Sequence, residues 1–202
     1  MKELQSERQI WQAFKGGDRD ALALIFTAYY PLLHHYGLQI SRDSALTEDL
    51  LQDFFLYLYE RRKNLSDLDS PRAYLFTSFR RMLLRKLKSA DRQSVSLEEV
   101  ASAQPFVQFS VEELQIKGEE ATFRVDILIH TLNKLPGRQR EVIYLRYYND
   151  MSLKEIAEVM SITYQGVANT LQKAFNVLRK DVNVLKIREL GVLLAMMATW
   201  LS

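Results

Sequence analysis

Side chains capable of covalent or acid–base chemistry are scarce in this chain of 202 residues. No cysteine is present, which excludes disulfides, thiolate metal ligands and a cysteine nucleophile. His34 and His35 lie in an apolar run with no carboxylate at metal-ligand spacing, which favours a partly buried structural pair over a metal site. No nucleophile, base and orienting residue combine into a catalytic set. We therefore expect no catalytic residues, no metal and no cofactor.

The polar faces of helices are then the candidate binding surfaces. A helix is predicted from about Ser44 to Glu60, with its apolar residues on one side. The opposite side is expected to carry Asp49, Gln52, Asp53, Leu56 and Glu60. Carboxylates opposite a core are commonly only solvated, whereas an apolar side chain among them is typical of a docking surface. The residues alone leave a solvated face and a partner-binding face evenly balanced.

A second helix is predicted from Arg72 to about Lys88, because Ser70 followed by Pro71 is a good start signal. Its polar face would carry Tyr74, Thr77, Ser78, Arg81, Arg85 and Lys88, with Arg80 and Lys86 at the edges. A merely soluble face would mix both charge signs, but this face has no acid. Cations neutralise phosphates, and hydroxyl and aromatic groups contact bases and sugars, so nucleic acid is favoured. Binding of this kind is weak, with a Kd of about 10⁻⁴ to 10⁻⁶ M, and needs a second site or a partner.

The third feature is a pair of helices between Met151 and Leu178. Ser152 and Glu155 form the pattern of a capping box, and a turn is predicted at Ser161. This arrangement is typical of a helix-turn-helix, although a plain pair of packed helices remains the alternative. The outer face of the second helix would present Gln165, Asn169, Gln172, Lys173, Asn176 and Lys180. Asn and Gln suit adenine edges, whereas Lys suits guanine or phosphate.

An all-α fold is predicted to position these faces, because apolar residues recur at helical spacing between prolines and glycines. Pro31 and Gly37 are placed between helices. Two helical domains are expected, at residues 1–92 and 121–183. An acidic linker, 93–120, would join them, although part of it could instead form a packed helix.

The ends of the chain carry two further expectations. The charged amino terminus has no apolar signal region, and no charge-free apolar stretch approaches the ~20 residues of a membrane-spanning helix. We therefore expect a cytoplasmic protein without membrane insertion. The apolar tail, residues 184–202, would gain on the order of 10 kcal/mol on burial. It is expected either to close the core of the second domain, or to pack across both domains or on a partner and hide a polymerase- or DNA-binding face.

The order of these segments resembles bacterial sigma factors of the extracytoplasmic-function type, over about Arg8 to Asp181. TEDLLQDFFLYLY and SPRAYLFTSFRRMLLRKLKS resemble sigma domain two, which implies a first helix that ends near Tyr36 ahead of them. LNKLPGRQREVIYLRYYNDMSLKEIAEVMSI resembles sigma domain four. The resemblance implies a non-enzymatic initiation factor whose partners are core RNA polymerase, promoter DNA and an anti-sigma factor. Two rivals remain: a helix-turn-helix regulator acting without polymerase, and an all-helical adaptor that binds only protein.

The resemblance also implies roles for individual residues. The polymerase clamp would bind Asp49, Gln52, Asp53 and Leu56. The loop before the basic helix would capture a flipped minus-ten base, and the helix would hold the melted strand, through Asn64, Asp67, Ser70, Tyr74, Ser78, Arg81, Arg85 and Lys88. The minus-thirty-five element would contact Lys154, Gln165, Asn169, Gln172 and Lys173. Ala168 and Thr170 are uncharged where many relatives are basic, which implies a readout that relies on the amides and favours A·T-rich sequence.

Overall fold

The computed structural model describes residues 2–90 and 129–184, with side chains placed from Glu7 to Ser89 and from Ile129 to Lys180. The linker expected at 93–120 and the tail after residue 184 lie outside the described residues. In the described part every regular element is helical and no strand occurs, so the all-α prediction is confirmed. Within the same part, no helix is long and apolar enough to cross a bilayer.

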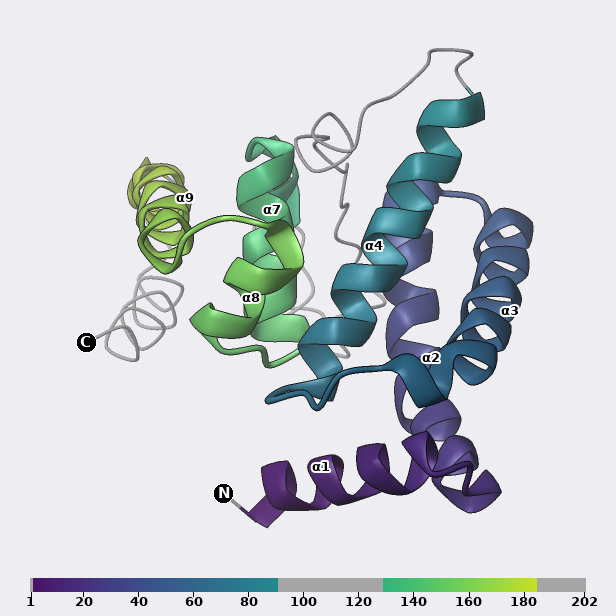
Figure 1. Ribbon diagram of the computed structural model, residues 1–202. Helices are drawn as coiled ribbons and strands as arrows, with labels where there is room; N and C mark the ends of the chain where they lie inside the picture. Colours follow the sequence, from purple (N-terminus) through teal and green to yellow (C-terminus); the bar gives the residue numbers. More distant parts are fainter. Residues whose placement is uncertain (1, 91–128, 185–202) are drawn as a thin grey trace, which may run out of the picture.

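The chain forms two helical groups (Figure 1). The amino-terminal group consists of α1 (Lys2–Lys15), α2 (Arg19–Ser41), α3 (Ser44–Arg61), the short 3₁₀ turn η1 (Arg62–Asn64) and α4 (Pro71–Ala90). The carboxy-terminal group consists of α7 (Gly137–Ile143), the π-helical turn η3 (Tyr144–Tyr148), α8 (Leu153–Met160) and α9 (Tyr164–Val184). Residues 129–134 form a further helical segment ahead of α7.

Local side-chain chemistry explains where several helices begin. The Asp18 carboxylate accepts hydrogen bonds from the first backbone amides of α2, and Asp43 accepts one from Leu46 at the start of α3. Ser152 and Glu155 form the predicted capping box of α8. Each cap satisfies amide groups that have no partner within the helix.

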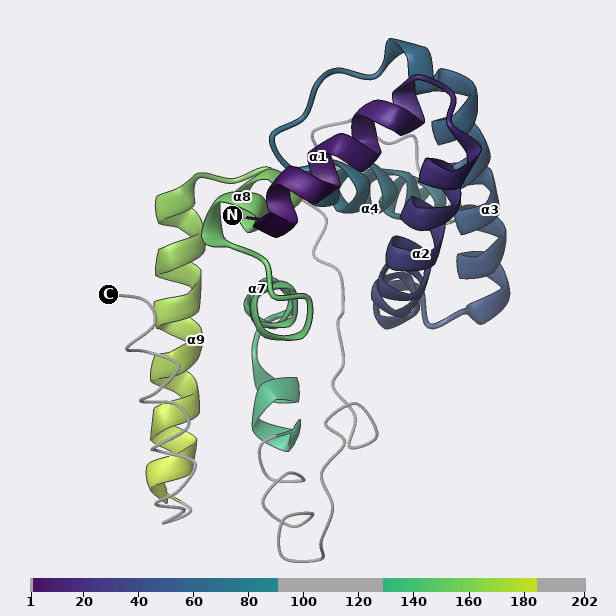
Figure 2. The ribbon, with the colours of Figure 1, turned by 90° about the horizontal axis from the view of Figure 1, so that it is seen from below.

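The core of the amino-terminal group lies where α2, α3 and α4 pack together. Its fully buried side chains are Trp11, Phe14, Leu33, Tyr36, Leu51, Phe54, Leu58, Leu75, Phe76, Phe79 and Leu83. Figure 1 shows α1 running across the ends of α2 and α4, and Figure 2, seen from below, shows α1 crossing α4. The apolar side predicted for α3 is buried, at Leu50, Leu51, Phe54, Phe55 and Leu58. On the apolar side of α4, Leu75, Phe76, Phe79 and Leu83 are buried, whereas Met82 and Leu87 are half-buried.

One expectation about α2 was wrong: the helix does not end near Tyr36 but continues to Ser41, and it contains both Pro31 and Gly37. Pro31 is exposed and removes one backbone hydrogen bond, but the buried face on either side of it, including Ile25 and Ile40, holds the helix in place. Gly37 lies where α2 meets its neighbours. A Cβ there would come within 2.7 Å of Thr47 on α3 and 3.0 Å of Phe79 on α4.

The two helical groups pack against each other. Buried residues of both belong to one continuous hydrophobic cluster, and α8 lies directly against α4. Figures 1 and 2 both show α4 between α8 on one side and α2 and α3 on the other. Neither composition nor helical period predicts this arrangement.

We predict that Gly37→Ala lowers the free energy of unfolding by about 1–3 kcal/mol, because the added methyl group forces α2 away from α3 and α4. Thermal denaturation followed by circular dichroism would report this as a fall in Tm of several degrees. Gly166→Ala is the matched control, since its new Cβ would meet no atom nearer than the Thr163 hydroxyl at 3.1 Å, and the next neighbour, Ile162, is at the ordinary contact distance of 3.8 Å. An equal loss in both variants would contradict the close-approach role of Gly37.

Candidate nucleic-acid interface

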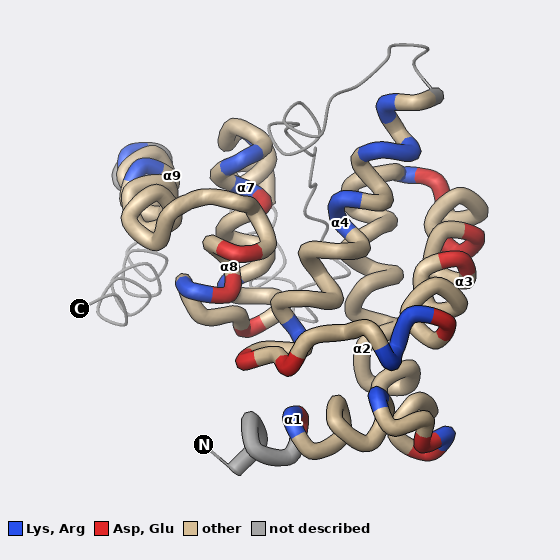
Figure 3. The backbone as a smooth tube through the Cα atoms, in the orientation of Figure 1, with Lys and Arg blue, Asp and Glu red and all other residues tan. Residues whose placement is uncertain are grey.

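The outer face of α3 carries the acidic surface expected from the sequence. Asp49, Gln52, Asp53 and Glu60 are all exposed, while the opposite face of α3 is buried. Leu56 lies among them with 59% of its surface exposed, more than any other large hydrophobic side chain in the described part of the chain. Figure 3 shows the acidic positions of α3 on the side turned away from α4. This α3 face therefore combines carboxylates with an uncovered apolar side chain.

Helix α4 begins at Pro71 as predicted, with the Ser70 hydroxyl accepting a hydrogen bond from the Ala73 amide. Arg81 and Arg85 are exposed and Lys88 is half-buried, and Figure 3 shows the basic positions following one another along this helix. Among the described residues, none of these three cations is in an ion pair. Their charge therefore remains available to a polyanion.

Arg80 differs from expectation. It was predicted at the edge of the polar face, but only 3% of its surface is exposed and it forms an ion pair with the buried Glu141 of α7. Arg80 is buried because the carboxy-terminal group covers this side of α4. Burial alone would lower the pKa of Arg80, but the Glu141 carboxylate outweighs this effect and raises the pKa above its usual value.

The loop before α4 is braced by α1. The Asp67 carboxylate accepts hydrogen bonds from Lys15 and, at 2.8 Å, from Gln12, and these bonds lower its pKa. Arg8 forms an ion pair with Asp69 at 2.9 Å. Sequence reasoning missed this role of α1, although the polar residues at positions 8, 12 and 15 have the spacing of one helix face. Asn64, which precedes the loop, is exposed.

Two further residues of the expected minus-ten set are held by neighbours. Tyr74 is half-buried, and the indole ring of Trp11 packs edge-on against it with ring centroids 5.7 Å apart. Burial raises the pKa of Tyr74, with a hydrogen bond involving Ser78 acting in the opposite direction. The Ser70 hydroxyl donates to the Glu155 carboxylate of α8 at 2.7 Å. The loop therefore contacts both α1 and the carboxy-terminal group.

The helix pair α8–α9 has the turn predicted for it. Ser161 adopts a left-handed conformation (φ 53°) at the end of α8, and Val167, Leu171 and Ala174 are fully buried on the inner face of α9. The outer face of α9 exposes Gln165, Asn169, Gln172 and Lys173, and Lys154 is exposed on α8. Within this face the Gln165 amide donates to the Asn169 side-chain oxygen at 3.0 Å. The two amides are thereby held together as one hydrogen-bonding unit.

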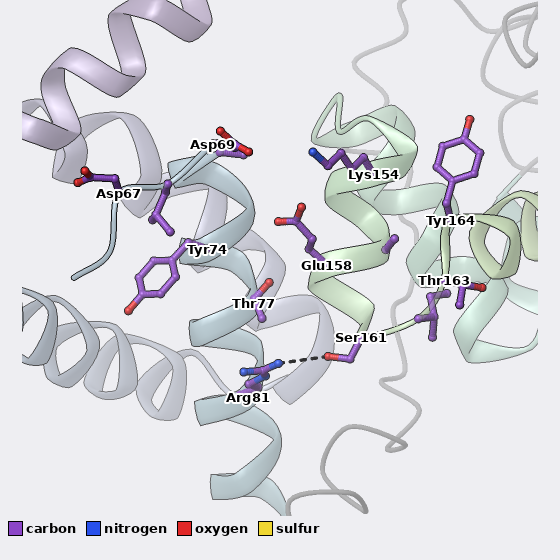
Figure 4. Close-up of a pocket in the computed structure, with 14 residues that line it drawn as sticks. Asp67, Asp69, Tyr74, Thr77, Arg81, Lys154, Glu158, Ser161, Thr163 and Tyr164 are labelled. Carbon is purple, nitrogen blue, oxygen red and sulfur yellow. Dashed lines mark hydrogen bonds between the residues drawn. The ribbon is translucent and has the colours of Figure 1, made fainter. Parts of the chain in front are cut away.

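A groove of about 980 Å³ separates the loop and α4 from α8 and the start of α9. Figure 4 shows Asp67, Tyr74 and Arg81 on one side of it and Lys154 and Tyr164 on the other. The Arg81 guanidinium donates to the Ser161 hydroxyl across the groove at 3.4 Å. Residues expected to contact two different DNA elements therefore face one another in this conformation.

The histidines are part of the packing between helices. His34 lies 3.5 Å from the Glu48 carboxylate, and His35 stacks on the rings of Tyr144 and Tyr148. Both are half-buried. Within the described part of the chain, no group of three or more potential metal ligands occurs.

Comparison with known proteins assigns the two groups to one family. The family described as "Sigma-70 region 2" matches residues 25–93, and "Sigma-70, region 4" matches residues 126–178. Together these regions include more than half of the chain.

Relatives and solved structures agree with this assignment. The chain is 28% identical to the ECF RNA polymerase sigma factor SigL of Mycobacterium tuberculosis, over 83% of this chain and 89% of SigL. It is 24% identical to the ECF RNA polymerase sigma factor SigW of Bacillus subtilis, over 89% of this chain and 98% of SigW.

CnrH, solved in complex with the cytosolic domain of CnrY, has a similar fold (TM-score 0.56, 20% identity, 88% of this chain and 97% of CnrH covered). So does RpoE of Bartonella quintana, solved with the anti-sigma factor NepR (TM-score 0.56, 18% identity, 82% and 97% covered). The chain therefore belongs to the extracytoplasmic-function (ECF) family of sigma factors, which direct RNA polymerase to promoters.

Proposed function

We propose that the chain performs promoter-directed initiation through three separate faces. The α3 face, with Asp49, Gln52, Asp53 and Leu56, binds the clamp of core polymerase. Helix α4 and the loop before it hold melted minus-ten DNA, and the outer face of α9 reads the minus-thirty-five element. The observation that supports this division is the segregation of exposed charge, with carboxylates on α3 and cations or amides on α4 and α9.

The division of labour follows the two helical groups. Residues 1–92 would form the polymerase-binding and DNA-melting unit, and residues 121–183 the upstream-element unit. Polymerase supplies the chemistry, so the chain acts as a non-catalytic factor in the cytoplasm, where polymerase and the chromosome are found. An anti-sigma factor is a proposed partner on the precedent of RpoE and NepR.

The braced loop suits the capture of a base. Extruding a base from the stack costs a few kcal/mol, which contacts in the protein must repay. A loop already fixed by Arg8, Gln12 and Lys15 loses little conformational entropy when it closes on that base. We therefore assign Asn64, Asp67 and Ser70 to the rim of the base pocket, with Tyr74, Ser78, Arg81, Arg85 and Lys88 along the strand that follows.

The decisive experiment is run-off transcription with purified core polymerase on a promoter library. We expect defined transcripts that depend on the chain, and protection of two DNA elements only when polymerase is present. Tight binding to a palindromic site without polymerase would instead identify a helix-turn-helix regulator. Binding to protein alone, with no effect on DNA, would identify an adaptor.

The α3 face is tested by Leu56→Arg. Burying a leucine contributes ~1.5–3 kcal/mol, so the variant is expected to bind core polymerase about tenfold more weakly or worse. Fluorescence anisotropy of labelled chain titrated with core polymerase measures this affinity. The matched control is Leu24→Arg on α2, which is similarly exposed, at 55%, but lies outside the α3 face. Equal losses in the two variants would argue against the α3 face as the docking surface.

The outer face of α9 is tested by a pair of variants. Asn169→Ala is expected to relax the preference at one base pair by about 1–3 kcal/mol, because it removes an amide that reads a base edge. Lys173→Ala is expected to weaken binding to all promoters alike and to reduce the salt dependence by about one phosphate contact. Holoenzyme binding to single-base promoter variants at several salt concentrations separates the two effects. The assignment fails if both variants change all promoters equally.

A further inference from the structure

Tyr57 of α3 is an exposed aromatic side chain that none of the three proposed faces includes. Its ring is 49% exposed. It lies four residues after Asp53 and four residues before Arg61, so these three side chains follow one edge of the helix. Along this edge the charge changes from acidic, at the α3 face, to basic. The uncharged ring of Tyr57 marks the boundary.

The end of α3 beyond this ring is basic. Arg61 and Lys63 are both exposed, and among the described residues neither is in an ion pair. Arg62, between them, is held against the helix instead: its guanidinium lies 4.1 Å from the Tyr59 ring centroid and donates to the Tyr59 carbonyl oxygen at 2.6 Å. Figure 3 shows basic positions where α3 leads into the loop before α4. Two cations therefore remain available to phosphates at the end of the helix that carries Tyr57.

One of these cations contacts the Tyr57 ring. The Arg61 guanidinium lies over the ring, with its central carbon 5.7 Å from the ring centroid. This distance is close to the ~6 Å limit of a cation–π contact, so the guanidinium holds the ring only loosely. A base stacked on the ring and a phosphate bound to the guanidinium would use these two side chains together. Proteins that bind single-stranded nucleic acid combine aromatic rings and positive charge in this way.

Tyr57 is also close to Tyr74 of α4, which is assigned above to the melted minus-ten strand. Burial is the main cause that raises the pKa of Tyr74; a hydrogen bond involving Ser78 lowers this pKa, and the neighbouring Tyr57 hydroxyl raises it again. Tyr74 is half-buried, and the Trp11 ring packs edge-on against it. A second, more exposed ring therefore lies near a ring that its neighbours hold in place.

We propose that Tyr57 and Arg61 extend the path of the melted strand from α4 onto the end of α3, where the Tyr57 ring stacks with one unpaired base and Arg61 binds an adjacent phosphate. This inference rests on the proposed function and adds two residues to it. Every base has a face that can stack on a ring, so the contact holds the strand without selecting its sequence. The ring also separates the phosphates from the carboxylates of the α3 face, because Asp53 lies one turn away.

The proposal is tested by binding of holoenzyme to a single-stranded oligonucleotide that carries the minus-ten element of a promoter found in the run-off experiment. Tyr57→Ala is expected to weaken this binding about tenfold, because one base loses its stacking surface. Tyr57→Phe keeps the ring and is expected to bind as the parent does. Arg61→Met is expected to reduce the salt dependence by about one phosphate contact. The matched control is Tyr164→Ala, since Tyr164 is 57% exposed but belongs to the carboxy-terminal group.

Photocross-linking identifies the stacked base directly. The oligonucleotide carries 5-iododeoxyuridine at one position at a time, a base analogue that cross-links on irradiation to an aromatic ring stacked against it. We expect a cross-link to Tyr57 from one position in or next to the minus-ten element, identified by mass spectrometry of the modified peptide. The cross-link is expected to persist in Tyr57→Phe and to disappear in Tyr57→Ala.

Three outcomes would overturn the proposal. Two of them are unchanged oligonucleotide binding by Tyr57→Ala and the absence of any cross-link to Tyr57. The third is a loss of affinity for core polymerase that accounts for the whole defect of Tyr57→Ala, measured by the anisotropy titration used for Leu56→Arg; Tyr57 would then belong to the α3 face. Failure of the proposed function looks different, because holoenzyme with the wild-type chain would then not prefer the minus-ten oligonucleotide to one of scrambled sequence.

Discussion

Helix α4 must satisfy two opposite physical demands, and the arrangement of the other helices follows from them. One side of it carries Leu75, Phe76, Phe79 and Leu83, which are fully buried, and α1, α2, α3 and α8 all contact this helix. The other side carries cations with no carboxylate of its own to neutralise them. The apolar side of α4 must be covered by other helices to exclude water, and the cationic side is suited to binding a polyanion. The core of the amino-terminal group is therefore built around the same element that is proposed to hold DNA.

Features that depend on a few adjacent residues could be predicted from the sequence. The capping box of Ser152, the start of α4 at Pro71 and the exposed faces of α3 and α9 all follow from local chemistry or from helical period. The order of the segments along the chain was also enough to predict an ECF sigma factor. In each case the interactions lie within one helix or one turn, so no tertiary information was needed.

Features that depend on residues distant in sequence could not be predicted in the same way. Proline and glycine normally punctuate helices, but the packing of α2 overrides that tendency at Pro31, and Gly37 serves a close approach between helices. Arg80 has the helical position of an edge residue, and only the partner Glu141, 61 residues away, explains its burial. Composition and period carry no signal for the packing between the two groups, because that packing depends on which side chains meet.

The bracing of the loop by α1 has a consequence for genetics. Arg8, Gln12 and Lys15 hydrogen-bond to the carboxylates of Asp67 and Asp69, in the loop that leads into α4. On the proposed function, a selection for altered promoter use would therefore recover substitutions at Arg8, Gln12 and Lys15 in α1. These substitutions lie far in sequence from the loop before α4. Their effect would nevertheless be local, because they change only how firmly that loop is held.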